Sequence, residues 1–302
     1  MKRGDISGIV LLHKEEGMSS QFAVNRVKRI FGVDKAGHTG TLDPLATGVL
    51  PVLVGRAVKA SEFMLTADKH YSATLLLGVK TDTDDITGTV LREVDEMPSE
   101  EEVISAAKSF IGKSKQVPPM YSAIKVGGEK LYELARRGET IEREARDIVI
   151  HSLEIKRLSE REYKIDVHCS KGTYIRSLLA DIGERLGVGG TMKTLERTEA
   201  SGFPLGMTHT LGEFEGMSEE ERLSHVVPVE RVFDKMEAVS LSPFFARLAH
   251  SGQEIYLRKI ARELAVGTLV RLLDTEGFFA IGEVREFEDG LAIKPIRQFG
   301  KL

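Results

Sequence analysis

One carboxylate stands out among the residues that could perform covalent chemistry. Asp43 lies in the segment Gly37-His-Thr-Gly-Thr-Leu-Asp-Pro-Leu-Ala-Thr-Gly48. Pro44 fixes its own φ and disfavours helical backbone at Asp43, so the carboxylate is expected to project from a rigid turn. The ordinary alternative is an Asp whose carboxylate only accepts hydrogen bonds from nearby backbone N–H groups. The glycines around Asp43 favour function, because they let another surface approach the backbone closely.

A second polar segment, Ser170-Lys-Gly-Thr-Tyr-Ile-Arg176, lies between a predicted strand and a predicted helix. Gly172 can form the turn and Thr173 can cap the helix. Tyr174 and Arg176 would then lie in the first helical turn. A guanidinium there could pair with a carboxylate, keep it ionised and lower its pKa. The alternative is a surface ion pair worth less than about 1 kcal/mol.

Other candidate motifs fit less well. The segment Asp82-Thr-Asp-Asp-Ile-Thr-Gly88 resembles a calcium loop, but Ile86 and Thr87 stand where an oxygen ligand and a glycine are required. A metal-dependent nuclease that uses Asp82, Asp84 and Asp85 is therefore a remote hypothesis. His38 has no second His or Cys at ligand spacing, and we expect no metal there.

The composition is that of an ordinary globular protein, since 41% of the 302 residues are hydrophobic and 29% are charged. These proportions exclude disordered and collagen-like chains, and the length is comfortable for two domains. The one cysteine, Cys169, lies in an alternating run typical of a buried strand and indicates a reducing compartment. No secretory core or long apolar run is present, so we expect a cytoplasmic protein without membrane contact.

Charge is unevenly distributed along the chain. The formal net charge of −4 disfavours a nucleic-acid partner when taken alone, because phosphate binding depends on Lys and Arg. However, residues 21–80 hold eight basic side chains against four acidic ones, and residues 113–146 hold eight against five. A basic face with acidic outer helices is compatible with this distribution.

The elements that must position these groups follow from periodicity and capping signals. A helix capped by Ser19 or Ser20 ends at Gly32, and the capping box that begins at Ser99 opens a second helix that ends at Gly112. A third helix is predicted over 174–186. Strands are predicted over 9–12, 69–78, 145–156, 162–170, 269–273, 278–284 and 291–296. A structured loop is expected over 35–48, and an irregular basic and aromatic insertion over about 113–140.

Six blocks in order carry a resemblance to a known family: His38-Thr-Gly-Thr-Leu-Asp-Pro-Leu-Ala-Thr-Gly-Val-Leu50, Lys69-His-Tyr71, Thr81-Asp-Thr-Asp84, Pro118-Pro-Met-Tyr-Ser-Ala123, Ser170-Lys-Gly-Thr-Tyr-Ile-Arg176 and Leu195-Glu-Arg-Thr198. Together they resemble the bacterial TruB family of tRNA pseudouridine synthases over about residues 5–235. The tail is similar to a PUA domain, an RNA-binding β-barrel, and its nine basic and nine acidic residues make it neutral.

The resemblance implies an α+β fold in which helices flank a central mixed, largely antiparallel sheet, followed by a small C-terminal β-barrel. It implies a catalytic domain over residues 1–235, with the RNA-binding insertion at about 113–140, and a PUA-like RNA-binding domain over 236–302.

The reaction that the resemblance implies is isomerisation of a uridine in the T loop of tRNA, at tRNA position 55. Uracil is detached from ribose, turned and rejoined through C5, which is redox-neutral and moves no phosphate. We therefore expect no cofactor and no metal. The resemblance also implies action without guide RNA, and we expect a monomer. The target base must be flipped out of its stack.

The same resemblance implies roles for individual residues. Asp43 would be the nucleophile, and its attack on the base or on the sugar is left open. Tyr71 would lie against the uracil and take part in removal of the C5 proton, and Arg176 would pair with Asp43. Tyr174 and Leu195 would hold the nucleotide, and His38 would fill the space left by the flipped base. In the insertion, RNA contacts are expected from Tyr121, Lys125, Lys130, Arg136 and Arg137.

A second hypothesis is a factor for RNA folding or assembly whose pocket serves binding alone. It is compatible with catalysis, because a protein that clamps a T loop could also help tRNA to fold.

Overall fold

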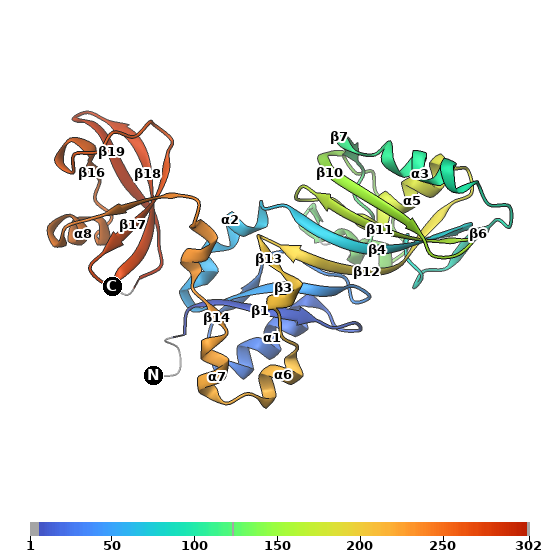
Figure 1. Cartoon of the computed structure of the whole chain (residues 1–302), viewed down its shortest axis with the longest axis horizontal. Helices are drawn as coiled ribbons and strands as arrows, with labels where there is room; N and C mark the ends of the chain where they lie inside the picture. Colours follow the sequence, from blue (N-terminus) through green and yellow to red (C-terminus); the bar gives the residue numbers. More distant parts are fainter. Residues whose placement is uncertain (1–5, 123, 301–302) are drawn as a thin grey trace.

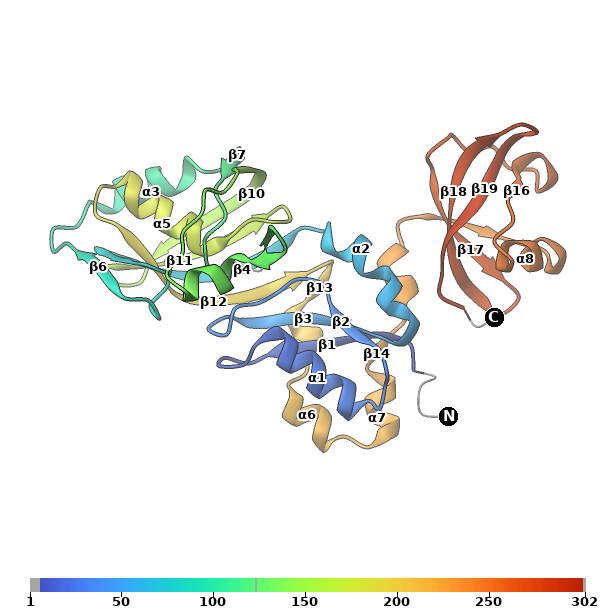
Figure 2. The same cartoon turned by 180° about the vertical axis from the view of Figure 1, so that it is seen from behind.

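The computed structural model describes residues 6–122 and 124–300. Two separate β-sheets dominate the chain, and Figure 1 shows them at different places along an elongated molecule. The larger sheet is built from the first three quarters of the chain, and the smaller one lies at one end and contains the C-terminal strands. Figure 2 shows the same arrangement from behind.

The larger sheet has ten strands and is largely antiparallel. In spatial order its main strands are β14 (Val226–Val227), β1 (Gly8–Lys14), β3 (Thr47–Val54), β12 (Gly190–Ala200), β4 (Lys69–Leu77), β11 (Glu162–Cys169), β10 (Arg146–Arg157) and β7 (Gly112–Gln116). The two others are β2 (Ala36–His38), which pairs with β3, and β13 (Phe203–Pro204), which pairs with β12. Two hairpins stand apart, β5 (Val79–Thr81) with β6 (Val90–Glu93), and β8 (Lys125–Val126) with β9 (Glu129–Lys130).

A short parallel contact joins two halves of this sheet. β3 and β12 pair only at Thr47 with Glu196 and at Gly48 with Arg197. On one side lie β1 and β3, and on the other β12, β4, β11, β10 and β7. The loop that carries Asp43 ends where β3 begins, so the fold places this residue at the seam between the halves.

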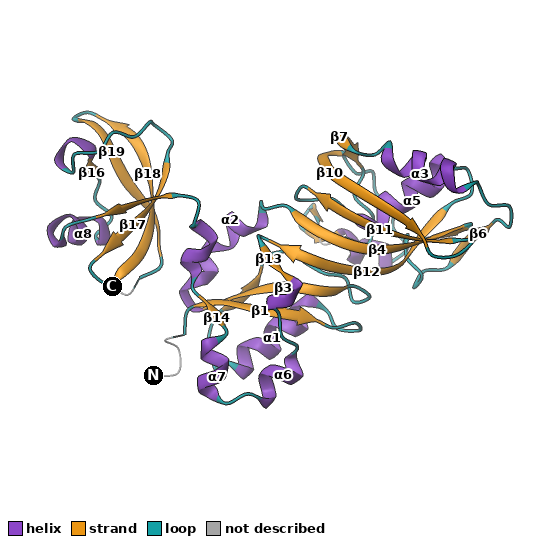
Figure 3. Cartoon of the chain, viewed as in Figure 1, coloured by secondary structure: helices purple, strands orange, loops and turns teal. Residues whose placement is uncertain are grey.

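Helices cover both halves. The helices of the chain are α1 (Ser20–Ile30), α2 (Ser61–Leu65), α3 (Glu100–Lys108), α4 (Leu131–Arg136), α5 (Ile175–Arg185), α6 (Leu211–Gly216), α7 (Glu219–Ser224) and α8 (Pro243–His250). Short 3-10 turns span Gly55–Ala60, Leu205–Met207, Val229–Phe233 and Leu257–Lys259. Figure 3 shows α1 and α6 against β1 and β3, and α3 with α5 against the other half.

Each half of the sheet contributes apolar side chains to one continuous core. Ala73 and Leu75 of β4 and Ile165 of β11 pack with Leu179 and Ile182 of α5. Because strand residues alternate between faces, this core face of β4 also carries Tyr71. The residues between them, such as Ser72 and Thr74, lie on the opposite face and are only partly buried.

The smaller sheet has the order β15 (Glu237–Ser240), β17 (Leu269–Asp274), β18 (Gly277–Phe287), β19 (Gly290–Gln298) and β16 (Ile255–Tyr256). It curls around a core of its own, which α8 closes. A second cluster joins it to the rest of the chain, where Ile281 and Phe299 pack with Ala60 and Phe233. Lys59 also donates to the Gln298 carbonyl at 3.0 Å.

The structure confirms the predicted fold class and many of its elements. The helix at Ser99 begins with the expected capping box, in which Glu102 Oε2 accepts from the Ser99 N–H at 2.8 Å. The predicted strands over 69–78, 145–156 and 162–170 correspond to β4, β10 and β11.

Two predictions are wrong. Thr173 does not cap α5, because the N-cap is Tyr174 and the Thr173 hydroxyl bonds to the Ser170 carbonyl. The first residues of the expected irregular insertion form β7, which pairs with β10 and belongs to the sheet. Across the described ranges, none of the helices is long and apolar enough to cross a membrane.

Candidate active site

Hydrogen bonds within the loop and from α1 hold the backbone of the loop that carries Asp43. The Asp43 carbonyl accepts from Ala46 N at 3.0 Å, which closes a turn with Pro44 at its second position. Ser20, at the start of α1, accepts from Leu42 N at 2.8 Å and donates to the Leu42 carbonyl at 2.9 Å. The backbone of the turn is therefore held before any ligand binds.

Lys14, the last residue of β1, supports the same turn and was not singled out from the sequence. Its side chain is fully buried, and its ammonium donates to the carbonyls of Glu15, Pro44 and Ala46 at 2.9, 3.3 and 2.5 Å. Burial lowers the pKa of Lys14 to about 8, and the nearby Asp43 carboxylate opposes this shift. Three carbonyl acceptors account for the three N–H donors of an ammonium.

Arg176 joins Asp43 to the rest of the site. Its side chain is 5% exposed, and its Nε lies 3.0 Å from Asp43 Oδ2. Nη1 donates to the Thr83 carbonyl at 3.1 Å and contacts Asp85 Oδ2 at 3.4 Å, and Nη2 donates to the Tyr121 carbonyl at 2.6 Å. The position at the start of α5 gives the pairing that the sequence led us to expect.

The segment set aside as a false calcium loop holds the second carboxylate of this network. Asp85 is buried, and its Oδ1 accepts from the hydroxyls of Thr83 and Thr87 at 2.9 and 2.5 Å and from Thr87 N at 3.0 Å. Asp84 has a φ of 62°, and this left-handed residue turns the chain so that Asp85 points inward. Thr87, one of the residues that disfavour a calcium loop, thus helps Thr83 to orient Asp85 toward Arg176.

Burial raises the pKa of the Asp43 carboxyl above its usual value. Arg176 is the largest opposing influence, Asp85 raises the pKa further, and Lys14 lowers it. The sequence predicted that the guanidinium would lower this pKa. It does so, but the loss of water around the carboxylate outweighs it.

Tyr71 enters the site from β4, and Arg197 enters from β12 beside it. Arg197 is buried, and its Nε donates to the Val49 carbonyl at 2.7 Å and its Nη2 to the Gly40 carbonyl at 3.1 Å. Burial raises the pKa of Tyr71, against the opposing influence of Arg197. The phenol therefore stays protonated at neutral pH and can donate a hydrogen bond.

Tyr174 is held through its backbone by a residue of β7. Gln116 Oε1 accepts from Tyr174 N at 2.8 Å, and Gln116 Nε2 donates to the Tyr174 carbonyl at 3.0 Å. This side chain binds both backbone polar groups of the N-cap residue and so fixes the start of α5, two residues before Arg176. Gln116 could not be identified from the sequence, because its position depends on the pairing of β7 with β10.

These side chains surround one pocket with a volume of 250 Å³. Six of the residues predicted for the site line it: Asp43, Tyr71, Tyr121, Tyr174, Arg176 and Leu195. His38 lies two residues from the lining residue Gly40, whose N–H donates to His38 Nδ1 at 3.3 Å. Within the described part of the chain, the lining residue Thr39 has a buried hydroxyl without a hydrogen-bond partner. The pocket therefore suits a polar ligand.

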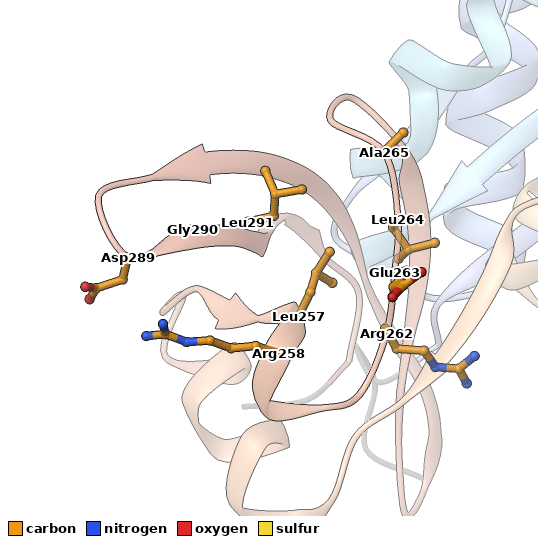
Figure 4. A pocket seen from close by; sticks show the side chains of 9 residues that line it. All are labelled: Leu257, Arg258, Arg262, Glu263, Leu264, Ala265, Asp289, Gly290 and Leu291. Carbon is orange, nitrogen blue, oxygen red and sulfur yellow. The ribbon is translucent and has the colours of Figure 1, made fainter.

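A larger hollow of 670 Å³ lies in the C-terminal sheet, away from these groups. Figure 4 shows Leu257 and Leu291 within it, with Arg258 and Arg262 extending outward on different sides. Its lining offers surfaces for binding but no nucleophile paired with a cation. We assign the chemistry to the smaller pocket, because a carboxylate lies there against a buried guanidinium.

The basic residues predicted in the insertion lie outside the pocket: Lys125 on β8, Lys130 on β9, Arg136 on α4 and Arg137 directly after α4. Lys130 Nζ lies 5.3 Å from the centre of the Tyr132 ring, and the Arg136 guanidinium lies 5.4 Å from it. Arg137 forms two ion pairs, from Nη2 to Glu129 Oε2 and from Nε to Glu139 Oε1, each at 2.8 Å. Contacts of these side chains with RNA stay a prediction.

Two consecutive segments of the chain match models of protein families. Residues 28–175 match the model of the TruB family pseudouridylate synthase, N-terminal domain. Residues 176–234 match the model of the tRNA pseudouridylate synthase B C-terminal domain. The second match ends just before β15, the first strand of the smaller sheet.

Curated relatives match nearly the whole chain. A tRNA pseudouridine synthase B of Clostridium tetani (strain Massachusetts / E88) is 39% identical over 279 residues, which cover 92% of this chain and 96% of the relative. Another from Francisella tularensis subsp. novicida (strain U112) is 40% identical over 285 residues, with coverage of 93% and 92%.

Solved structures share the fold. A chain in the crystal structure of a Cbf5-Nop10-Gar1 complex matches with a TM-score of 0.73 and 27% identity, over 97% of this chain and 85% of that one. A chain in the structure of an H/ACA RNP bound to a substrate RNA containing 2′-deoxyuridine matches with a TM-score of 0.72 and 24% identity, with the same coverage.

Proposed function

The chain belongs to the TruB family of pseudouridylate synthases, and on that premise we propose that it converts a uridine in the T loop of tRNA, at tRNA position 55, to pseudouridine. It is an isomerase of the kind that its relatives are named for, a tRNA pseudouridine synthase. One observation supports the detailed assignment above all. Asp43 lies in a pocket against the buried guanidinium of Arg176, with Tyr71 and Tyr174 among the walls.

Asp43 is the nucleophile of this proposal. The bond between N1 of uracil and C1′ of ribose breaks, while the carboxylate holds one of the two partners in a covalent adduct. After the base turns, a bond forms between C5 and C1′, the adduct is released, and the proton lost from C5 is balanced by one gained at N1. Arg176 contacts Oδ2 and holds the orientation of the carboxylate.

The walls of the pocket bind and orient the base. Tyr71 lies against the uracil and takes part in removal of the C5 proton, and Tyr174 and Leu195 hold the nucleotide. The unpartnered hydroxyl of Thr39 can bond to the polar edge of a pyrimidine, which would satisfy a group that is costly to leave buried and unpaired.

The position of Asp43 in the wall of a pocket supports base flipping. A uridine inside a folded loop can reach this carboxylate only when it leaves its stack, which costs a few kcal/mol. His38, at the rim of the loop, would fill the space that the base leaves. Burial lowers the pKa of His38, with Arg197 acting in the same direction, so its ring is neutral and suited to stacking.

The RNA surface is proposed to include the insertion, with Tyr121, Lys125, Lys130 and Arg136 as contacts. We propose tRNA without guide RNA, because the relatives named tRNA pseudouridine synthase B are 39–40% identical over most of the chain. The chains from ribonucleoprotein complexes are 24–27% identical. We further propose that residues 1–235 form the catalytic domain and residues 236–302 a PUA-like RNA-binding domain.

The substitution Asp43→Asn tests the proposal. The carboxamide cannot act as nucleophile, so we expect the single-turnover rate of pseudouridine formation in an unmodified tRNA transcript to fall by at least about 1,000-fold, or about 4 kcal/mol. Binding of tRNA should stay within a few fold, because the pocket keeps its shape. Asp82→Asn, in an exposed loop, is the matched control and should keep normal activity.

Two results would contradict the proposal in different ways. Modification at the normal rate by the Asp43→Asn protein would remove Asp43 as the nucleophile. A wild-type protein that binds tRNA but forms no pseudouridine would favour the alternative of a factor for RNA folding or assembly.

A further inference from the structure

Three histidines lie side by side on the face of the large sheet opposite the active site. His70 of β4, His168 of β11 and His151 of β10 come from three adjacent strands. His70 and His168 are direct cross-strand partners, and their rings stack with centroids 4.0 Å apart. The His151 and His168 rings are 4.6 Å apart. Asp68, just before β4, lies beside them.

The donor atoms of this cluster are close enough to share one ion. Asp68 Oδ2 lies 3.1 Å from His151 Nε2 and 3.8 Å from His168 Nε2, and the three ligand atoms all lie within 4.8 Å of one another. Donors bound to tetrahedral zinc at about 2.0–2.1 Å are about 3.3–3.4 Å apart. Small side-chain rotations would therefore bring these three groups to the spacing that a metal requires.

We propose that Asp68, His151 and His168 bind one divalent transition-metal ion of the zinc class, with His70 stacked against His168 as a support. Two imidazoles and one carboxylate suit Zn²⁺, Co²⁺ or Ni²⁺, whereas Mg²⁺ and Ca²⁺ prefer oxygen ligands alone. All three ligand side chains are partly exposed, which leaves room for water as a fourth ligand.

The site would act on the stability of the sheet. An ion there ties β10 and β11 to the segment that leads into β4. On its other face β4 carries Tyr71, one residue after His70, so the strands that the ion joins are those that position this ring. Because the ligands come together only in the folded chain, metal binding stabilises the native state.

The test uses the full chain, freed of any affinity tag and of metal. Co²⁺ is titrated while the visible absorption of the ion is recorded, and Zn²⁺ is then added as competitor. We expect one equivalent of Co²⁺ per chain, displacement by Zn²⁺, a higher Tm with either ion, and no Tm change with Mg²⁺. The double variant His151→Ala with His168→Ala should lose at least about tenfold in affinity.

A second histidine pair provides the control. His209 Nε2 lies 3.1 Å from His225 Nδ1, and this pair is separate from the cluster around Asp68. Replacing both histidines with Ala should leave Co²⁺ binding unchanged. The single variant His151→Ala alters one exposed side chain and repeats the test with little risk to folding. The proposal is overturned if the wild type binds no Co²⁺ saturably, or if the His151 and His168 variants bind it as tightly as the wild type. Neither readout depends on the proposed activity.

Discussion

At the scale of single residues, the site is a balance of buried charges around Asp43. Water is partly excluded from the carboxyl, which raises its pKa, while Arg176 and Lys14 oppose this and Asp85 adds to it. Asp85 therefore has two effects. It raises the pKa of Asp43 through like charge, and it also holds the guanidinium that pairs with Asp43. These effects can be separated by their dependence on pH.

Asp85→Asn should shift the acid limb of the pH–rate profile to lower pH. If Asp43 is the nucleophile, as we propose, it must be ionised to attack, so activity should be lost as the pH falls through its raised pKa. Removing a neighbouring negative charge lowers that pKa, and the loss then begins at a lower pH. The plateau rate should fall about tenfold, because Arg176 loses one of its two carboxylate partners. Single-turnover rates across pH measure both changes.

Asp82 lies on the same loop but is exposed. Asp82→Asn should therefore leave the acid limb of the pH–rate profile and the plateau rate unchanged. If the limb of Asp85→Asn moved to higher pH, the assignment of Asp85 as a group that raises the pKa would be wrong.

The residues of the site differ in how well they could be predicted from the sequence. Asp43 and Arg176 lie in dense polar segments, and the matching blocks placed them together before any geometry was known. Lys14, Asp85 and Gln116 could not be found in the same way. Their roles depend on burial and on partners about 30, 90 and 60 positions away, which arise only when the strands pair.

At the scale of elements, the seam between β3 and β12 decides where the loop of Asp43 lies. Gly48 has a φ of 100°, and a Cβ added there would lie 2.3 Å from the Arg197 carbonyl oxygen. Backbone cannot move aside as a side-chain tip can. Only glycine therefore allows β3 to approach β12 at this point.

Gly48→Ala should destabilise the protein by about 3 kcal/mol or more, because both the left-handed backbone and the contact with Arg197 are violated. Gly17→Ala is the matched control. Gly17 also has a positive φ, of 86°, but an added Cβ would meet nothing within 4 Å. Its cost should be only about 1–2 kcal/mol. Equal midpoints for the two variants in urea denaturation would show that the seam tolerates a Cβ.

Elements with a regular pattern were predictable, and those set by their neighbours were not. β4, β10 and β11 alternate clearly, because one face is buried and the other is not. β12 carries Lys193, Glu196 and Arg197 among its residues, and Arg197 is buried against backbone carbonyls from the Asp43 loop and β3. A buried arginine on a central strand breaks the alternation from which strands are recognised.

The insertion yields a prediction that separates two adjacent arginines. Arg137 already pairs with Glu129 and Glu139, whereas Arg136 lies over the Tyr132 ring. Arg136→Ala should therefore reduce the slope of log K against log salt for tRNA binding by about 0.7–0.9, the effect of one phosphate contact. Arg137→Ala should reduce this slope less than Arg136→Ala does. A larger effect at Arg137 would mean that its carboxylate partners release it when RNA binds.

At the scale of the whole molecule, the smaller sheet is attached by an aromatic junction and lies apart from the chemistry. Phe233 and Phe278 have ring centroids 5.8 Å apart, and Phe233 and Phe299 are 5.6 Å apart. Residues of this sheet do not line the pocket of Asp43 within the described chain. The tail is neutral overall, so any contribution to RNA affinity must come from local groups such as Arg258 and Arg262 beside the hollow of Figure 4.

Deleting residues 237–302 should therefore weaken tRNA binding more than it slows single-turnover chemistry at saturating enzyme. Phe233→Ser is included in the truncated chain, because the deletion would otherwise expose its ring. The full-length double variant Arg258→Ala with Arg262→Ala keeps the junction intact and should weaken binding in the same direction. If instead the chemical step slowed while affinity stayed constant, the smaller sheet would act on the geometry around Asp43 through the junction at Ala60 and Phe233.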